Sequence, residues 1–143
     1  MEELQEKSLH PPQAAAATGA AQKTQFTDVD PEVQLAIRSA AEKKATDIVV
    51  LDLRQIASFA EFFLIASGAN QRQVQAISDE IEEQLKKQLS TRPVRIEGYN
   101  VAEWVLMDYG DFIVHIFNKE AREFYDLERL WRDAVKVAIP DDL

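Results

Sequence analysis

Asp108 and Asp111 are the first residues that could carry chemistry in this chain. They are separated by Tyr109 and Gly110, and nearly continuous apolar runs flank them within residues 104–117. Because a tight turn would bring two carboxylates together, the pair could serve acid–base or metal-dependent chemistry. Aspartates in turns more commonly bond to the local backbone, and carboxylates beside an exposed tyrosine are also typical of protein interfaces. The residues alone leave these three interpretations open, and no reaction class follows from them.

His115 is the second candidate, and it lies in a strongly apolar stretch of the same segment. We interpret it as a core histidine whose ring nitrogens find hydrogen-bond partners. The alternative is a proton shuttle or a metal ligand, which requires neighbouring groups that the sequence does not supply. The chain's other imidazole, His10, lies far away near the N-terminus.

Recurrent catalytic motifs are missing from the sequence. The glycines Gly19, Gly68, Gly98 and Gly110 are too scattered to form a phosphate-binding loop. Ser67 lacks the G-x-S-x-G pattern of a nucleophile elbow. The absence of cysteine excludes disulfides, thiol catalysis and cysteine–zinc sites. We therefore predict a protein that is not an enzyme, with no catalytic residue, cofactor or metal.

The element that must position Asp108, Asp111 and His115 is a β-hairpin over residues 104–117. A short break that contains aspartate and glycine, between β-branched and aromatic runs, is the signature of such a hairpin. Neither half alternates cleanly between apolar and polar residues. We therefore expect both faces of the sheet to be covered, with helices as the cover.

The remaining elements follow from hydrophobic periodicity. Strands are predicted over residues 47–53, 62–66 and 94–97, and helices over residues 31–44 and 71–89. Asp30 and Asn70 are predicted to cap the two helices, with Gln73 reaching back toward Asn70. Strands and helices that interleave around a hairpin predict an α/β fold with a mixed sheet of about five strands flanked by helices.

The C-terminal region is also predicted to be helical, either as one helix or as two pieces with Asp126 capping the second. One core-facing side is expected to carry Phe124, Leu127, Leu130, Trp131 and Val135.

Length and composition suit a single domain. Residues 1–29 have few large apolar side chains and are predicted to be a disordered tail, whereas residues 30–143 form the domain. The chain has no apolar run long enough to span a membrane and no signal-peptide pattern at its N-terminus. A cytoplasmic location is the expectation.

The charge distribution favours a basic protein as the partner. The net charge is −9, and residues 97–133 hold nine acids against four bases. Such a surface is a poor match for a phosphate backbone, so we expect little direct nucleic-acid contact. A basic protein surface is complementary to it, although a negative balance also simply favours solubility.

Four segments together resemble the ribosomal silencing factor family, also called Iojap. They are D-I-V-V-L-D-L, F-F-L-I-A-S-G-A-N-Q-R-Q-V-Q-A-I, W-V-L-M-D-Y-G-D-F-I-V-H-I-F and E-A-R-E-F-Y-D-L-E-R-L-W, and the resemblance covers about residues 33–134. One departure lies where relatives often read S-x-A-D-Y-F. This chain has Glu61 in place of the aspartate and Phe62 in place of the tyrosine, which puts any hydrogen bond made there in relatives in doubt.

The resemblance implies a fold similar to that of nucleotidyltransferases but without their catalytic acids. It implies binding to the large ribosomal subunit through its fourteenth protein, a block of association with the small subunit, and repression of translation when nutrients are limiting. Relatives in organelles act in large-subunit assembly or regulation, so an assembly factor is the alternative. A metal-dependent nucleotidyltransferase that uses acids such as Asp47, Asp52, Asp108 or Asp111 is less favoured. Apolar and aromatic surface around the hairpin could also pair two copies of the free protein.

Carried over position by position, the family's ribosomal-protein-binding surface falls on the hairpin and the segment after it. Trp104 and Tyr125 would supply apolar contact, and Gly110 would allow a positive φ in the turn. Carboxylates would pair with lysines or arginines of the partner. The full predicted set is Trp104, Asp108, Tyr109, Gly110, Asp111, Glu123 and Tyr125.

Overall fold

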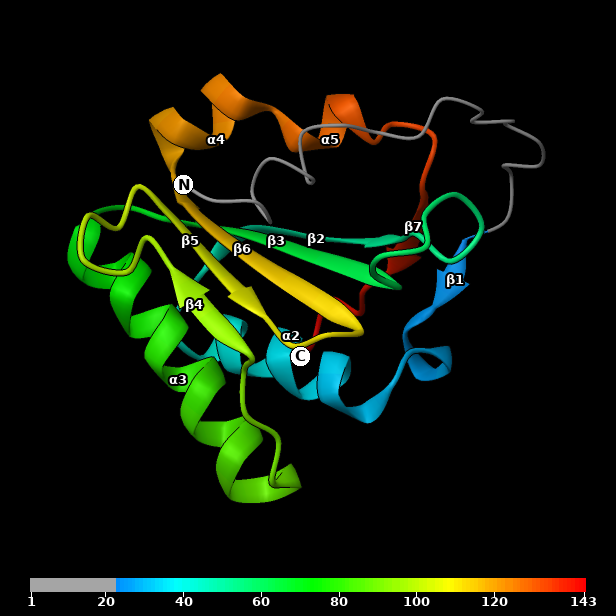
Figure 1. The fold of residues 1–143 in the computed structure, drawn as a ribbon, viewed down its shortest axis with the longest axis horizontal. Helices are drawn as coiled ribbons and strands as arrows, with labels where there is room; N and C mark the ends of the chain where they lie inside the picture. Colours follow the sequence, from blue (N-terminus) through cyan, green and yellow to red (C-terminus); the bar gives the residue numbers. More distant parts are fainter. Residues whose placement is uncertain (1–22) are drawn as a thin grey trace.

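A mixed β-sheet lies at the centre of the computed structural model, which describes residues 23–143 (Figure 1). Seven strands pair in the order β1-β7-β2-β3-β6-β5-β4. Their bounds are β1 Thr24–Gln25, β2 Thr46–Asp52, β3 Phe62–Gly68, β4 Arg95–Glu97, β5 Trp104–Asp108, β6 Phe112–Asn118 and β7 Val135–Ala138. The α/β class and the mixed sheet are confirmed, whereas the expected number of about five strands is wrong. The two additional strands, β1 and β7, have only two and four residues, too few to show a period.

The central pair of the sheet is β3 and β6, which run parallel with Phe62 opposite Phe112. The predicted hairpin is β5 and β6, which run antiparallel with Trp104 opposite Phe117. β1 and β7 are also parallel, and the other neighbouring strands are antiparallel.

Helices cover both faces of the sheet, as the continuous apolar strands predicted (Figure 1). The helix α2 (Pro31–Glu42) and the helix α3 (Gln71–Leu89) lie on one face. The short helices α4 (Lys119–Tyr125) and α5 (Leu127–Leu130) lie on the other. In the part of the chain that the structure describes, no helix is both long enough and apolar enough to cross a membrane.

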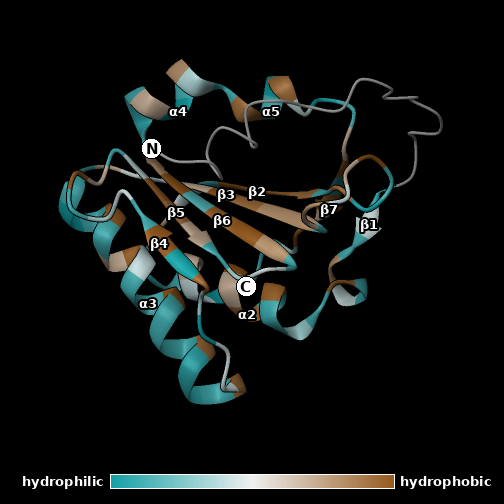
Figure 2. Ribbon diagram, in the orientation of Figure 1, coloured by the Kyte–Doolittle hydropathy of each residue, from teal (hydrophilic) through white to brown (hydrophobic). Residues whose placement is uncertain are grey.

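Each face of the sheet has its own apolar cluster. Successive side chains of a strand point to opposite faces, so Phe62 and Leu64 pack under α2 and α3, whereas Phe63 and Ile65 pack under α4 and α5. Figure 2 shows the contrast between the apolar strands and the polar outer surface of α3. The predicted apolar stripe of α3 is buried at Val74, Ile77, Ile81 and Leu85, but Leu89 is 37% exposed.

The predicted N-cap of α3 is confirmed. The Gln73 backbone N–H donates to Asn70 Oδ1 at 2.8 Å, and Gln73 Oε1 accepts from the Ala69 N–H at 2.6 Å. Asp30 occupies the N-cap position of α2, as predicted, but its side chain makes no capping hydrogen bond.

The segment before α2 is part of the fold over residues 24–29. β1 pairs with β7, and the 3₁₀ turn η1 (Phe26–Asp28) buries Phe26 in the cluster under α2 and α3. The predicted disordered tail of residues 1–29 therefore differs from the structure in its last six residues. Residues 1–22 lie outside the described residues.

Candidate functional site

The seven predicted binding residues divide into two groups at opposite ends of the hairpin (Figure 1). Residues 108–111, called the hairpin turn below, connect β5 to β6. Trp104 begins β5, and Glu123 and Tyr125 belong to α4, which follows the far end of β6. With a rise of about 3.4 Å per residue, β5 separates the two groups by about 13 Å. The structure thus does not gather the seven residues into one cluster.

The hairpin turn is fixed by its own backbone. The Gly110 N–H donates to Asp108 Oδ1 at 2.8 Å, and the Tyr109 N–H donates to the Phe112 carbonyl at 2.9 Å. Gly110 has a φ of 91°, as its predicted role required. The Asp111 carbonyl accepts from the Glu61 N–H at 2.6 Å. The Asp108 side chain therefore bonds to the local backbone, which is the common role of an aspartate in a turn.

Tyr109 does not project from the turn, contrary to the expectation. Its ring stacks on Phe112 with centroids 4.9 Å apart, and it packs against the cluster under α2 and α3. Its hydroxyl oxygen is buried without a hydrogen-bond partner. Burial, with a smaller contribution from the charge of Glu82, raises the pKa of the Tyr109 hydroxyl well above its ordinary value.

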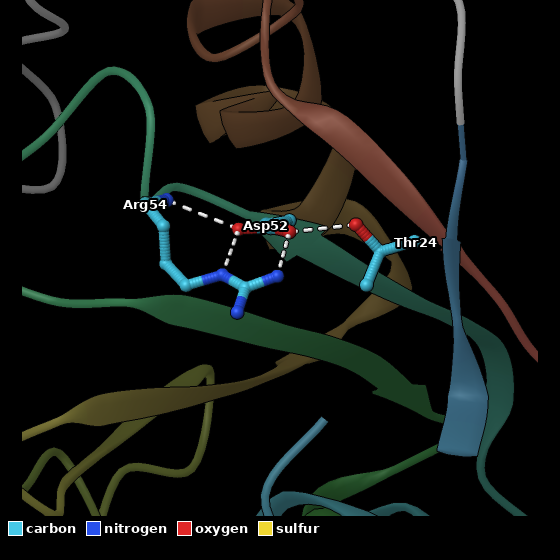
Figure 3. Close-up of polar contacts among 3 residues, drawn as sticks. All are labelled: Thr24, Asp52 and Arg54. Atoms are coloured by element: carbon cyan, nitrogen blue, oxygen red, sulfur yellow. Dashed lines mark hydrogen bonds and ion pairs between the residues drawn. The ribbon is translucent and has the colours of Figure 1, made fainter. Parts of the chain in front are cut away.

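Asp52, one of the acids considered for nucleotidyltransferase chemistry, is engaged in a polar network (Figure 3). Its Oδ1 accepts from the backbone N–H and from Nε of Arg54, both at 3.0 Å, and its Oδ2 accepts from Arg54 Nη2 at 2.7 Å and from Thr24 Oγ1 at 2.6 Å. Burial raises the pKa of Asp52, but these hydrogen bonds outweigh it and hold the pKa below its ordinary value. The network ties β1 to the end of β2.

Within residues 23–143, no group of three or more histidine and acidic side chains is placed to hold a metal ion.

Trp104 is only 5% exposed, so the prediction that it offers apolar surface to a partner is wrong. Its Nε1–H donates to His115 Nδ1 at 3.0 Å. Its ring lies 4.5 Å from that of Tyr125, centroid to centroid. Trp104 therefore supports the inner side of α4.

His115 is a neutral core residue. It is fully buried, and its Nδ1 accepts from Trp104, so the proton of the neutral ring resides on Nε2. Nε2 has no hydrogen-bond partner, and the ring lies at 75° to Phe63 with centroids 4.6 Å apart. Burial lowers the pKa of His115 to about 3. The core interpretation is thus confirmed, although only one ring nitrogen is partnered.

Phe124 was predicted to face the core, but it is 80% exposed. The alternative of two helical pieces is confirmed, because α4 ends at Tyr125 and Asp126 adopts a left-handed φ of 48° at the N-cap position of α5, although its side chain makes no capping hydrogen bond. The predicted core-facing side placed Phe124 in the same helical phase as Leu127 and Leu130, and the break at Asp126 removes that common phase. Phe124 therefore lies on the outward side of α4.

The outward side of α4, called the α4 face, consists of Glu120, Glu123 and Phe124. Spacings of three and four residues place these side chains together on one side of the helix. All three are exposed, and neither glutamate forms an ion pair with another described residue. An exposed aromatic ring beside unpaired carboxylates is typical of a surface that binds a basic protein.

Comparisons with known proteins agree on one family. The family model described as "Ribosomal silencing factor during starvation" matches residues 26–143. A Halalkalibacterium halodurans protein named ribosomal silencing factor RsfS is 43% identical over 107 residues, which are 75% of this chain and 91% of the relative. The mouse protein named "Mitochondrial assembly of ribosomal large subunit protein 1" is 28% identical over 102 residues, or 70% of this chain and 45% of the relative.

Solved structures give the same result. A crystal structure of a Chromobacterium violaceum protein has a TM-score of 0.68 and 33% sequence identity, covering 77% of this chain and 88% of that protein.

Proposed function

Because the chain belongs to the ribosomal silencing factor family, we propose that it binds the large ribosomal subunit and blocks association with the small subunit. The contact is made through the fourteenth protein of the large subunit, on the face that meets the small subunit. Translation falls as a result when nutrients are limiting. The mouse relative's name, which refers to the ribosomal large subunit, supports the choice of subunit.

The α4 face is the centre of the proposed contact, and the exposure of Phe124 is the observation that carries it. A phenylalanine that is 80% exposed leaves a large apolar surface in water. Glu120 and Glu123 beside it would pair with lysines or arginines of a basic ribosomal protein. Tyr125 supplies the adjoining aromatic surface, since its ring lies 5.0 Å from that of Phe124.

The hairpin turn lies at the margin of this contact. A standard interface buries about 800 Å² on each partner, a patch roughly 30 Å across, so one contact can include both the α4 face and Asp108 and Asp111, which lie about 20 Å away along β6. Asp111 is exposed and Asp108 is half-buried, so both acids can contribute charge to the margin.

The proposed mechanism is steric and involves no catalysis. A domain of this size has a radius of gyration of ~13 Å, and once docked it would occupy space that the small subunit needs. Any likeness to the nucleotidyltransferase fold would then concern architecture alone, because both carboxylate oxygens of Asp52 are already engaged by Arg54 and Thr24.

The test is a subunit-joining assay with the purified full chain. The protein should co-sediment with large subunits and lower the yield of joined ribosomes. Phe124→Ala should weaken co-sedimentation at least tenfold, since central aromatic residues dominate interface energies. Leu89→Ala is the control, because Leu89 is also an apolar side chain with exposed surface, at 37%, but lies at the end of α3 on the other face of the sheet. Unchanged joining at saturating protein would refute the block, and wild-type affinity of Phe124→Ala would remove the α4 face from the contact.

The second candidate function is large-subunit assembly, which the name of the mouse relative favours. The two roles use the same subunit but differ in timing. A deletion strain should accumulate large-subunit precursors if the protein acts in assembly. If it acts in silencing, the strain should show normal subunits and an excess of joined ribosomes during starvation.

We also propose that two copies of the free protein pair through the α4 face, which would shield Phe124 from water. Sedimentation of the free wild-type protein and of Phe124→Ala tests this pairing. A monomeric wild-type protein at all concentrations would contradict it.

A further inference from the structure

Burial of its own side chains only partly holds α4 in place, through Ala121 and Tyr125, which pack against the cluster beneath the helix. None of its seven residues is fully buried, and an isolated helix of this length is not stable in water. Asn118 caps its first turn by accepting from the Ala121 N–H at 2.8 Å. A cap fixes where a helix starts but does not determine which side faces the sheet.

Arg122 makes the contacts that can determine this rotation. Its Nε and Nη2 donate to the two carboxylate oxygens of Glu128, at 3.0 and 2.9 Å, and its Nη1 donates to Ser67 Oγ at 2.7 Å. Ser67 lies near the end of β3 and is 1% exposed, and the Arg122 side chain itself is 11% exposed. Arg122 thus joins α4 both to α5 and to a central strand.

The hydrophobic effect alone does not fix the observed rotation. Successive helical residues are offset by about 100°, so a turn of α4 about its axis would bring Phe124 toward the sheet and carry Tyr125 and Arg122 away from it. Burial of Phe124 would offset the lost contact between Tyr125 and Trp104. That turn would break the fork on Glu128 and the bond to Ser67, and it would leave the buried Ser67 hydroxyl without its donor.

We propose that Arg122 is a positioning residue that sets the rotation of α4 and thereby keeps Phe124 exposed. Its function is to present a surface rather than to stabilise the fold, since the Glu128 side chain is 31% exposed and water can solvate its carboxylate when Arg122 is replaced. The consequence for ribosome binding rests on the proposed function of the α4 face, whereas the consequence for Phe124 exposure does not.

The test separates presentation from stability. In the full chain, 4-fluorophenylalanine is placed at position 124, and its fluorine signal is followed with a soluble paramagnetic probe. Arg122→Met should reduce the broadening of the signal by at least half, because the ring moves toward the sheet. The same variant without the label should lose about tenfold in affinity for large subunits, while its thermal midpoint falls by no more than a few degrees and the fold is kept.

Two further variants locate the effect. Ser67→Ala deletes the link to β3 and should shift the fluorine signal in the same direction. Arg122→Lys keeps the charge but cannot form the two-point fork, so it should restore the accessibility of position 124 only in part.

The outcomes separate this inference from the proposed function. Wild-type accessibility of position 124 in both Arg122→Met and Ser67→Ala overturns the inference. Loss of the fold in Arg122→Met would also overturn it, because Arg122 would then be needed for stability. Reduced accessibility together with wild-type ribosome affinity would uphold the role of Arg122 and refute the α4 face as the docking surface.

Discussion

The hairpin turn and the α4 face, at opposite ends of β6, show two ways of fixing a surface. The conformation of the turn is set by short-range bonds from Gly110 to Asp108 and from Tyr109 to Phe112, and the backbones of Glu61 and Val94 add bonds that anchor it to neighbouring segments. The α4 face depends on Arg122, whose hydrogen bond to Ser67 spans 55 positions of the chain. The shape of the hairpin turn can be recognised from a few consecutive residues, whereas the α4 face can be recognised only in the folded chain.

In both regions the exposure of an aromatic residue is the opposite of what was expected. Tyr109 was expected to be exposed at a tip, but it packs against the cluster under α2 and α3. Phe124 was expected in the core, but it lies in solvent. Exposure was therefore decided by what covers each side chain, and position in a turn or helix was a poor guide to it.

The largest expected effect comes from comparing Gly110 of the hairpin turn with Gly98, which lies between β4 and β5. Gly98 and Gly110 both have a positive φ, but a Cβ on Gly98 would lie 2.2 Å from the Trp104 carbonyl oxygen, whereas a Cβ on Gly110 meets nothing within 4 Å. Gly98→Ala, at the base of the loop leading to Trp104, should cost at least about 4 kcal/mol of unfolding free energy. Gly110→Ala should cost about 1 kcal/mol. Denaturant unfolding measures both, and equal losses would break the comparison.

Acid should destabilise the end of the molecule near α4 through His115. Its pKa is about 3 in the folded protein and about 6.5 in the unfolded chain. The folded state therefore excludes a proton that the unfolded state binds, so the stabilisation is full above pH 6.5 and declines as the pH falls toward 3. The loss at pH 4.5 is about 3 kcal/mol.

His115→Gln isolates this contribution, because glutamine does not titrate. Its unfolding free energy should lie below that of the wild type at pH 7, since the Trp104 bond is disturbed, but should fall less steeply between pH 6.5 and 4.5. Parallel pH profiles for the two proteins would show that His115 contributes nothing to the acid dependence.

The smallest expected effect is on binding affinity, when one carboxylate in each region is replaced by lysine. Glu123→Lys, on the α4 face, should weaken binding to large subunits by about tenfold, whereas Asp111→Lys, at the margin, should weaken it by about threefold. Both effects should shrink as salt is added, because the charges are exposed. A larger effect for Asp111→Lys would move the centre of the contact to the hairpin turn.

Most of the architecture could be predicted because its signals are local. The hairpin, the strands β2, β3 and β4, the stripe of α3 and the Asn70 cap each follow from residues within one element. The strands β1 and β7 could not be found in this way. β1 lies in the segment predicted to be disordered, and β7 begins at Val135, which was wrongly placed on a helical face. Both strands exist because a neighbouring strand offers hydrogen-bonding partners.

The sequence by itself determined the family resemblance, the mixed α/β class and the acidic character of residues 97–133, because composition, motif order and periodicity are properties of the chain alone. Tertiary structure decided that the predicted binding residues lie in two groups, that Trp104 is buried and that Phe124 is exposed. The physical reason is that a residue's exposure depends on what the folded chain packs against it: Trp104 is covered by Tyr125 of α4, and Arg122 joins α4 to a strand more than fifty residues away.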